Sequence, residues 1–107
     1  MHGYQITFFT QQDKRHQGKP LGDWLLQLAQ ELGLPGATLI AGAEGFGHHR
    51  RLHSARFFEL ADQPQEVQLV AAAADADRLF ARLQAEGVHL FYVKVAVEFG
   101  TLGEAGA

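Results

Sequence analysis

Residues 34–47 constrain the fold most, because they contain a turn, a strand and a second turn in succession. Pro35 ends any preceding helix, since proline cannot continue one. Residues 37–43 form an apolar run of small and β-branched side chains, which predicts a buried strand. Gly45 and Gly47 follow, and glycine adopts backbone angles that other residues avoid. We therefore expect a buried strand that opens into a glycine-hinged loop.

Residues 48–54, which come next, are basic and rich in histidine. Loops held by a rigid sheet often carry binding residues. We therefore interpret residues 44–56 as a flexible loop that contacts a ligand or a protein partner. The alternative is a solvated connector whose charges serve only solubility.

Hydrophobic periodicity predicts three further strands and two helices. Alternating patterns indicate strands over residues 4–9, 65–71 and 90–99, and apolar spacings of three and four indicate helices over residues 20–32 and 74–86. The order is β-α-β-β-α-β. It predicts an α+β, ferredoxin-like βαββαβ sandwich, in which a four-stranded antiparallel sheet carries both helices on one face.

Local signals mark the ends of both helices. Gly33 and Gly87 are suited to end them in the left-handed conformation. Asp75 is expected to cap the start of the second helix, since aspartate accepts hydrogen bonds from free backbone N–H groups there. Trp24 lies on the apolar stripe of the first helix and is expected in the core.

The strand patterns also divide the sheet into two faces. The face under the helices is expected to carry Ile6, Phe8, Val67, Leu69, Val93, Val95 and Val97. The other face is expected to carry Thr7, Phe9, Gln68, Val70, Tyr92, Lys94 and Ala96. This second face contains enough apolar surface to favour self-association.

The βαββαβ order brings three connections to one end of the sheet, namely residues 10–19, 44–56 and 86–89. Together they contain Lys14, Arg15, His16, Lys19, His48, His49, Arg50, Arg51, His53 and His89. Positive charge beside glycine N–H groups suits a phosphate, a carboxylate or bicarbonate. The sequence therefore predicts a site for a small anionic ligand at this end.

Composition limits the alternatives. The 107 residues suffice for a single domain over residues 1–107, with a frayed tail over about 100–107. A net charge of −3 argues against a nucleic-acid binder. The chain has no cysteine, which excludes thiolate chemistry and is compatible with a cytoplasmic location. We expect no signal peptide, and no apolar run approaches the ~18 residues that a membrane span needs.

Two other site classes are alternatives to an anion site. His48, His49 and His53 could bind a divalent metal, although no carboxylate lies among them to complete a known ligand set. A small ferredoxin-like enzyme acting on an anionic substrate is a second alternative, but no catalytic spacing is evident, so we expect no enzyme. The glycines do not form a Walker or Rossmann motif.

The segments Gly36-Ala37-Thr38, Gly45-Phe46-Gly47 and Leu52-His53-Ser54 resemble the signature of the DUF190 family, within the PII-like (nitrogen-regulatory-protein-like) superfamily. The resemblance extends from about Ile6 to Val97. It implies a PII-like homotrimer that covers the open sheet face. It also implies an effector such as an adenine nucleotide bound between subunits, and a mobile loop that reports occupancy to a protein partner. The alternative within this superfamily is a divalent-metal-binding protein of the cation-tolerance type, with His48, His49 and His53 as ligands.

The resemblance places the effector near the loop base and the connection from the second helix to the last strand. Combined with the charge pattern, the expected ligand-binding residues are Gly45, Phe46, Gly47, Arg50, Arg51, Lys19, Gly87 and His89. No resident cofactor is expected beyond this effector.

Overall fold

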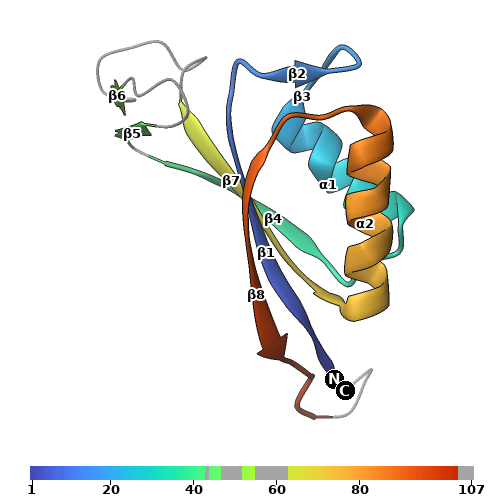
Figure 1. Cartoon of the computed structure of the whole chain (residues 1–107). Coiled ribbons are helices and arrows are strands. Elements are labelled where there is room, and N and C mark those ends of the chain that lie inside the picture. Colours follow the sequence, from blue (N-terminus) through green and yellow to red (C-terminus); the bar gives the residue numbers. More distant parts are fainter. Residues whose placement is uncertain (43, 47–51, 55–62, 104–107) are drawn as a thin grey trace.

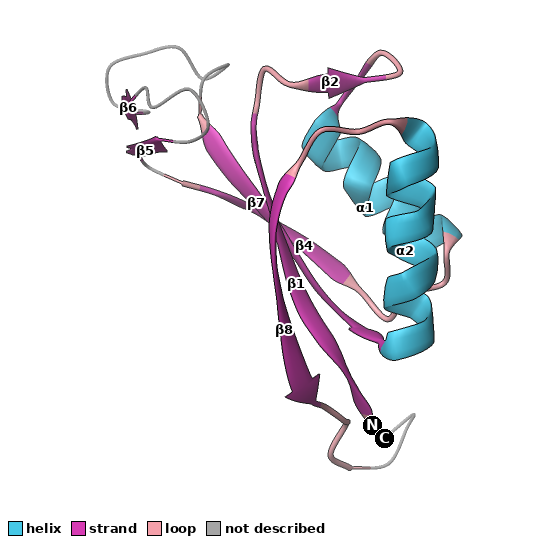
Figure 2. Cartoon of the chain, viewed as in Figure 1, coloured by secondary structure: helices cyan, strands magenta, loops and turns pink. Residues whose placement is uncertain are grey.

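The computed structural model describes residues 1–42, 44–46, 52–54 and 63–103, and it confirms the predicted fold class. An antiparallel four-stranded sheet has the order β4-β7-β1-β8, and both helices cover one of its faces (Figure 2). The sheet strands are β1 (His2–Gln11), β4 (Ala37–Ala41), β7 (Pro64–Ala72) and β8 (Phe91–Glu98), and the helices are α1 (Leu21–Glu31) and α2 (Ala73–Glu86).

Two short hairpins extend beyond this sheet (Figure 1). Strand β2 (Arg15–His16) pairs with β3 (Lys19–Pro20), and β5 (Glu44–Phe46) pairs with β6 (Leu52–Ser54). The first hairpin replaces part of a predicted loop. Its turn residues, Gln17 and Gly18, have φ angles of 53° and 79°. Positive φ at both turn positions is typical of tight two-residue hairpins, whose twist matches that of the strands.

The core lies between the helices and the sheet. Trp24 is 6% exposed, which confirms its predicted place. The buried apolar residues are Ile6, Phe8, Leu21, Trp24, Leu25, Leu28, Ala29, Leu34, Val67, Leu69, Ala71, Ala76, Leu79 and Leu83. Helix α1 therefore packs along the apolar stripe that its sequence predicts.

The helix ends agree with the glycine signals but not with the predicted cap. Gly33 and Gly87 have φ angles of 72° and 70°. The prediction that Asp75 caps α2 is wrong, because β7 runs directly into the helix and Ala72 is the N-cap residue. Asp75 lies in the first turn and pairs with Arg78 at 3.0 Å.

The predicted facing of β8 is also wrong. Phe8 lies opposite Tyr92 and Ile6 lies opposite Lys94 in the β1–β8 pair. Directly opposed residues of an antiparallel pair share a face. Tyr92 and Lys94 therefore lie on the helix side of the sheet, and the alternating valines of β8 lie on the open side.

Packing by Phe80 of α2 explains this orientation. Its ring centroid lies 4.8 Å from that of Tyr92 in an edge-to-face contact. The ammonium of Lys94 lies 4.2 Å from the Tyr4 ring centroid and 5.2 Å from that of Phe80. An amphipathic lysine can thus cover the edge of a core, with its charge over aromatic rings.

The open face of the sheet is consequently more apolar than predicted. Its exposed large side chains are Phe9 (38%), Ile40 (38%), Phe91 (68%), Val93 (42%) and Val95 (49%). The rings of Phe9 and Phe91 contact each other, with centroids 5.5 Å apart. The apolar side chains thus gather along β8 and Phe9, whereas Glu66 separates Ile40 from Phe9 across the face. Exposed apolar surface of this kind favours association.

Strand β4 lies at an edge of the sheet, so the prediction of a buried strand is wrong. Thr38, Ile40 and Ala41 are exposed, whereas Ala37 and Leu39 are half-buried on the helix side. The strand also ends at Ala41 rather than at residue 43. Small apolar residues can indicate either a central strand or an edge strand, and only the pairing order distinguishes them.

Candidate functional site

Three connections meet at one end of the sheet, as the chain order predicts (Figure 1). At this end, Gln11 of β1 lies opposite Pro64 of β7, and Ala41 of β4 lies opposite Gln65. Phe91, the first residue of β8, lies opposite Phe9. The links β1–α1, β4–β7 and α2–β8 therefore all leave or enter the sheet there.

The two hairpins at this end lie on opposite sides of the sheet. The β2–β3 hairpin lies above α1, and β5–β6 lies away from the helices (Figure 1). Lys19, in β3, donates a hydrogen bond to Oε1 of Gln27 in α1. Within one chain the structure therefore does not bring Lys19 beside Gly45 and Phe46 of β5.

The remaining predicted anion-binding residues divide into two groups. Gly87 and His89 lie in the α2–β8 connection, where both are exposed. Gly45 and Phe46 lie in β5, opposite His53 and Leu52 of β6. Gly47, Arg50 and Arg51 lie outside the described residues, so their part in binding stays a prediction.

The alternative metal site also falls mostly outside the described residues. His48 and His49 are not among them, and His53 lies in β6. Across the described ranges, the structure contains no cluster of three or more histidine, aspartate or glutamate side chains that could hold a metal ion.

Glu86, the last residue of α2, is the centre of a polar cluster that the sequence analysis missed. Its Oε1 accepts hydrogen bonds from Nε2 of His16 at 3.0 Å and from Nε2 of Gln17 at 2.8 Å. Its Oε2 accepts one from Nε of Arg82 at 3.1 Å. We call His16, Gln17, Arg82 and Glu86 the Glu86 cluster.

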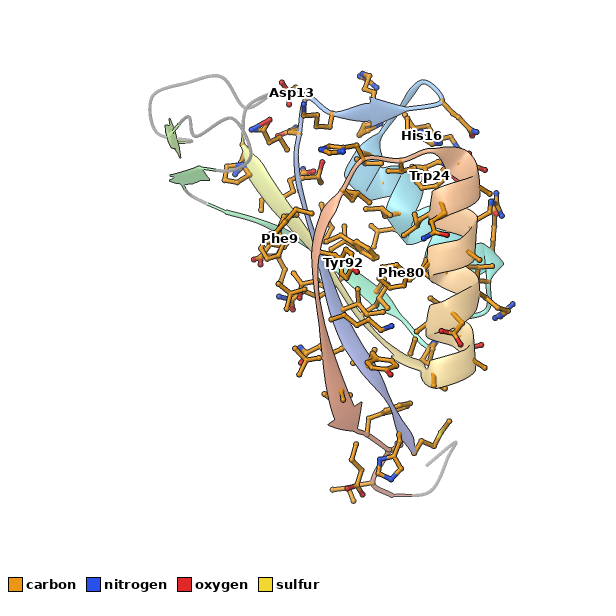
Figure 3. The ribbon with its side chains drawn as sticks, viewed as in Figure 1. Phe9, Asp13, His16, Trp24, Phe80 and Tyr92 are labelled. Atoms are coloured by element: carbon orange, nitrogen blue, oxygen red, sulfur yellow. The ribbon has the colours of Figure 1, made fainter. Side chains whose placement is uncertain are left out.

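The cluster is partly shielded from water, with exposed side-chain fractions of 19% for His16 and 18% for Glu86. The hydrogen bond from His16, followed by that from Arg82, lowers the pKa of the Glu86 carboxyl below its ordinary value of 4.5. The His16 ring also meets Trp24 edge-on, with centroids 4.4 Å apart (Figure 3). The cluster thus joins the β2–β3 hairpin to α2 and, through Trp24, to α1.

Only one contact of this cluster, the pair of Arg82 and Glu86, can be recognised from the sequence. Arg82 and Glu86 have the i,i+4 spacing of a helical ion pair. His16 and Glu86 are 70 residues apart, and no pattern in the sequence links them.

Two shallow grooves in the described residues lie away from this end of the sheet. One is lined by residues of the opposite end, including His2, Tyr4 and Glu98. The other lies beside α1 and β4, and its lining includes Leu26 and Pro35. Neither groove is lined by those of the predicted ligand-binding residues that the structure describes.

Neither α1 nor α2 could span a membrane. In the part of the chain that the structure describes, no helix has the length and apolar character needed to cross a bilayer.

A family model for DUF190, described as "Uncharacterized ACR, COG1993", matches residues 3–93. The chain is also 32% identical over 66 residues to a UPF0166 protein of Aquifex aeolicus strain VF5. That match spans 61% of this chain and 63% of the Aquifex protein, which is less than two thirds of its length.

Solved structures with the PII-like fold are similar in shape. The CPII protein of Thiomonas intermedia K12, a nitrogen regulatory PII-like protein bound to ADP, AMP and bicarbonate, has a TM-score of 0.69 at 12% identity, over 94% of this chain and 91% of its own. A candidate PII-like signaling protein of Thermus thermophilus has a TM-score of 0.63 at 18% identity, over 91% of this chain and 86% of its own. At these identities the likeness shows a common fold.

Proposed function

The chain belongs to the DUF190 family and has the PII-like fold, and on this basis we propose that it is an effector-sensing regulatory protein. The proposed effector is a small anion of the adenine nucleotide class, bound between subunits at the end of the sheet where the three connections meet. The loop of residues 44–56 would carry the signal to a protein partner. This role is regulatory rather than enzymatic, and we place it in the cytoplasm.

The observation that carries the proposal is the convergence of the three connections at one end of the sheet. Exposed Lys14 and Arg15 lie in the β1–α1 connection at this end, and exposed His89 lies in the α2–β8 connection. Cationic side chains attract phosphate groups. The structurally similar CPII protein is bound to ADP, AMP and bicarbonate, which supports an anionic effector of this class.

A trimer would complete such a site. Among the described residues, the open face carries five exposed large apolar side chains, from Phe9 to Val95. Covering this face against other copies would remove that surface from water. Association would also place the β5–β6 hairpin of one subunit near connections of the next. In that arrangement, Lys19 of one subunit and Gly45 of the next would contribute to one site.

A thermal-shift series tests the proposal. ATP, ADP, AMP, cyclic AMP and bicarbonate are added separately to the purified protein. A ligand at about 100 times its Kd adds ~2.7 kcal/mol of stability, which corresponds to a rise of several degrees in Tm for a domain of this size. Arg50→Ala combined with Arg51→Ala should reduce the rise.

The same series contains the contrary outcome. A flat response to all five compounds, at concentrations up to several millimolar, would contradict an anionic effector. A rise that the double alanine variant retains in full would remove Arg50 and Arg51 from the proposed site.

A further inference from the structure

We propose that Glu86 is a positioning residue that couples the α2–β8 connection to the β2–β3 hairpin, so that this hairpin responds to a nucleotide bound at the connection. The inference rests on the proposed function, because it takes the effector to bind beside Gly87 and His89. It adds a second responding element, which lies on the opposite side of the sheet from β5–β6 (Figure 1).

The geometry of Glu86 supports this role. Glu86 directly precedes Gly87, whose φ of 70° ends α2 and starts the connection. One carboxylate therefore lies next to the connection and also accepts two hydrogen bonds from the hairpin, at 3.0 Å from His16 and 2.8 Å from Gln17. A displacement of the connection on ligand binding would move the acceptor of both bonds.

The polar groups that face Glu86 hold the carboxylate in place. Arg82 donates from the same helix at 3.1 Å and also lies 3.7 Å from the Glu31 carboxylate at the end of α1. His16 faces Glu86 from the hairpin. Hydrogen bonds in which one partner is ionised are shorter and stronger than neutral ones, so the carboxylate is a firm attachment point for the hairpin.

The hairpin is otherwise attached through its own short ladder, through its link to α1 and through the hydrogen bond from Lys19 to Gln27 of α1. Leu21 N–H donates to the Lys14 carbonyl at 2.8 Å, and β2 and β3 each contain two residues. The His16 ring rests against Trp24, the single tryptophan of the chain. Loss of the Glu86 contacts should therefore loosen the hairpin without unfolding the sheet.

Hydrogen exchange with mass spectrometry tests the proposal on the full chain without ligand and with ADP. The variant is Glu86→Ala, and the matched control is Glu31→Ala, since Glu31 is also the last residue of a helix and also contacts Arg82. Without ligand, exchange in residues 12–21 should be severalfold faster in Glu86→Ala than in the wild type. It should be unchanged in the control.

With ADP, the wild-type protein should gain protection both at residues 87–90 and at residues 12–21. Glu86→Ala should keep the first gain and lose the second, which a purely structural role for Glu86 would not produce. If Glu86→Ala does not fold, His16→Ala removes one hairpin contact and leaves α2 intact, and it should give the same pattern in weaker form.

Two outcomes overturn the inference and can be told apart. If ADP protects residues 87–90 in the wild type but leaves residues 12–21 unchanged, the coupling is wrong and the proposed function stands. If ADP changes exchange nowhere, the proposed function fails for this nucleotide and the coupling fails with it.

Discussion

At the scale of single residues, Gly3 shows how closely two strands can approach. A Cβ atom at this position would lie 2.1 Å from the carbonyl oxygen of Ala71 and 2.8 Å from Cα of Ala72. Both are backbone atoms of β7, so neither can move aside as a flexible side chain would. The β1–β7 pairing therefore depends on glycine here.

We expect Gly3→Ala to lower the free energy of unfolding by at least the ~1–3 kcal/mol that overpacking typically costs. Gly36→Ala is the control, because nothing lies within 4 Å of its Cβ position. It should leave stability nearly unchanged or raise it slightly, since alanine restricts the unfolded chain. Urea unfolding at a fixed protein concentration compares the two. Equal stability of both variants would contradict the close approach.

Glu86 makes stability depend on pH in a definite direction. Its pKa is lowered in the folded protein by His16 and Arg82, so the unfolded chain binds the proton more tightly. Its stabilising contribution is therefore complete above the ordinary pKa of 4.5 and is lost as the pH falls through the lowered folded value.

Glu86→Gln should consequently be less stable than the wild type at pH 7, and the difference should shrink as the pH falls below 4.5. Urea unfolding at several pH values, with Glu31→Gln as the control, measures this. A difference that stays constant from pH 7 to pH 3 would show that the charge of Glu86 does not stabilise the fold.

Residues of the core can be predicted better than residues of the polar cluster. The burial of Trp24 can be predicted from helical spacing, because the apolar repeat that determines it is present in the sequence. The hydrogen-bond partners of Glu86 cannot be predicted from such a repeat, since a hydrogen bond between residues 16 and 86 depends on how a hairpin and a helix end meet in space. The cap prediction for Asp75 fails because the start of α2 depends on where β7 ends.

At the scale of elements, β8 shows a limit of the alternating pattern. Alternation separates Tyr92 and Lys94 from Val93 and Val95, but it does not say which set faces the helices. The apolar valines are the natural expectation for the core. In the structure, however, Tyr92 and Lys94 face the helices, because Tyr92 packs on Phe80 and the Lys94 ammonium lies over the Phe80 ring.

A pair of double-mutant cycles tests this facing. Phe80→Ala with Tyr92→Ala should show a coupling energy of ~0.5–1.5 kcal/mol, the range for aromatic pairs. Phe80→Ala with Val93→Ala should show a coupling near zero, since Val93 lies on the other face. Urea unfolding of the six proteins gives both values. A larger coupling to Val93 than to Tyr92 would mean that the facing of β8 is reversed.

At the scale of the whole molecule, the fold and the end at which the connections meet can both be predicted from element order. Element order does not predict which residues make up the assembled site, because Lys19 and Gly45 lie on opposite sides of the sheet in one chain. We therefore propose that a site using both residues is built by more than one subunit. The apolar open face is where such an assembly would form.

Val95→Asp tests the assembly. The wild type should have a native mass three times the 11.8 kDa of one chain, and the variant should be a folded monomer, because a buried unpaired carboxylate is costly. Gln84→Asp, an exposed change on α2, should keep the wild-type mass. Native mass spectrometry and circular dichroism follow both. A variant that keeps the trimer mass would exclude the open face as the interface.

The most direct test of the central claim, that an anionic effector binds between subunits, is calorimetric titration of ADP into these three proteins at equal concentration. We predict saturable binding by the wild type and by Gln84→Asp, and no measurable binding by the folded Val95→Asp monomer. Binding of ADP to the monomer with wild-type affinity, or no binding to a wild-type trimer, would contradict the account.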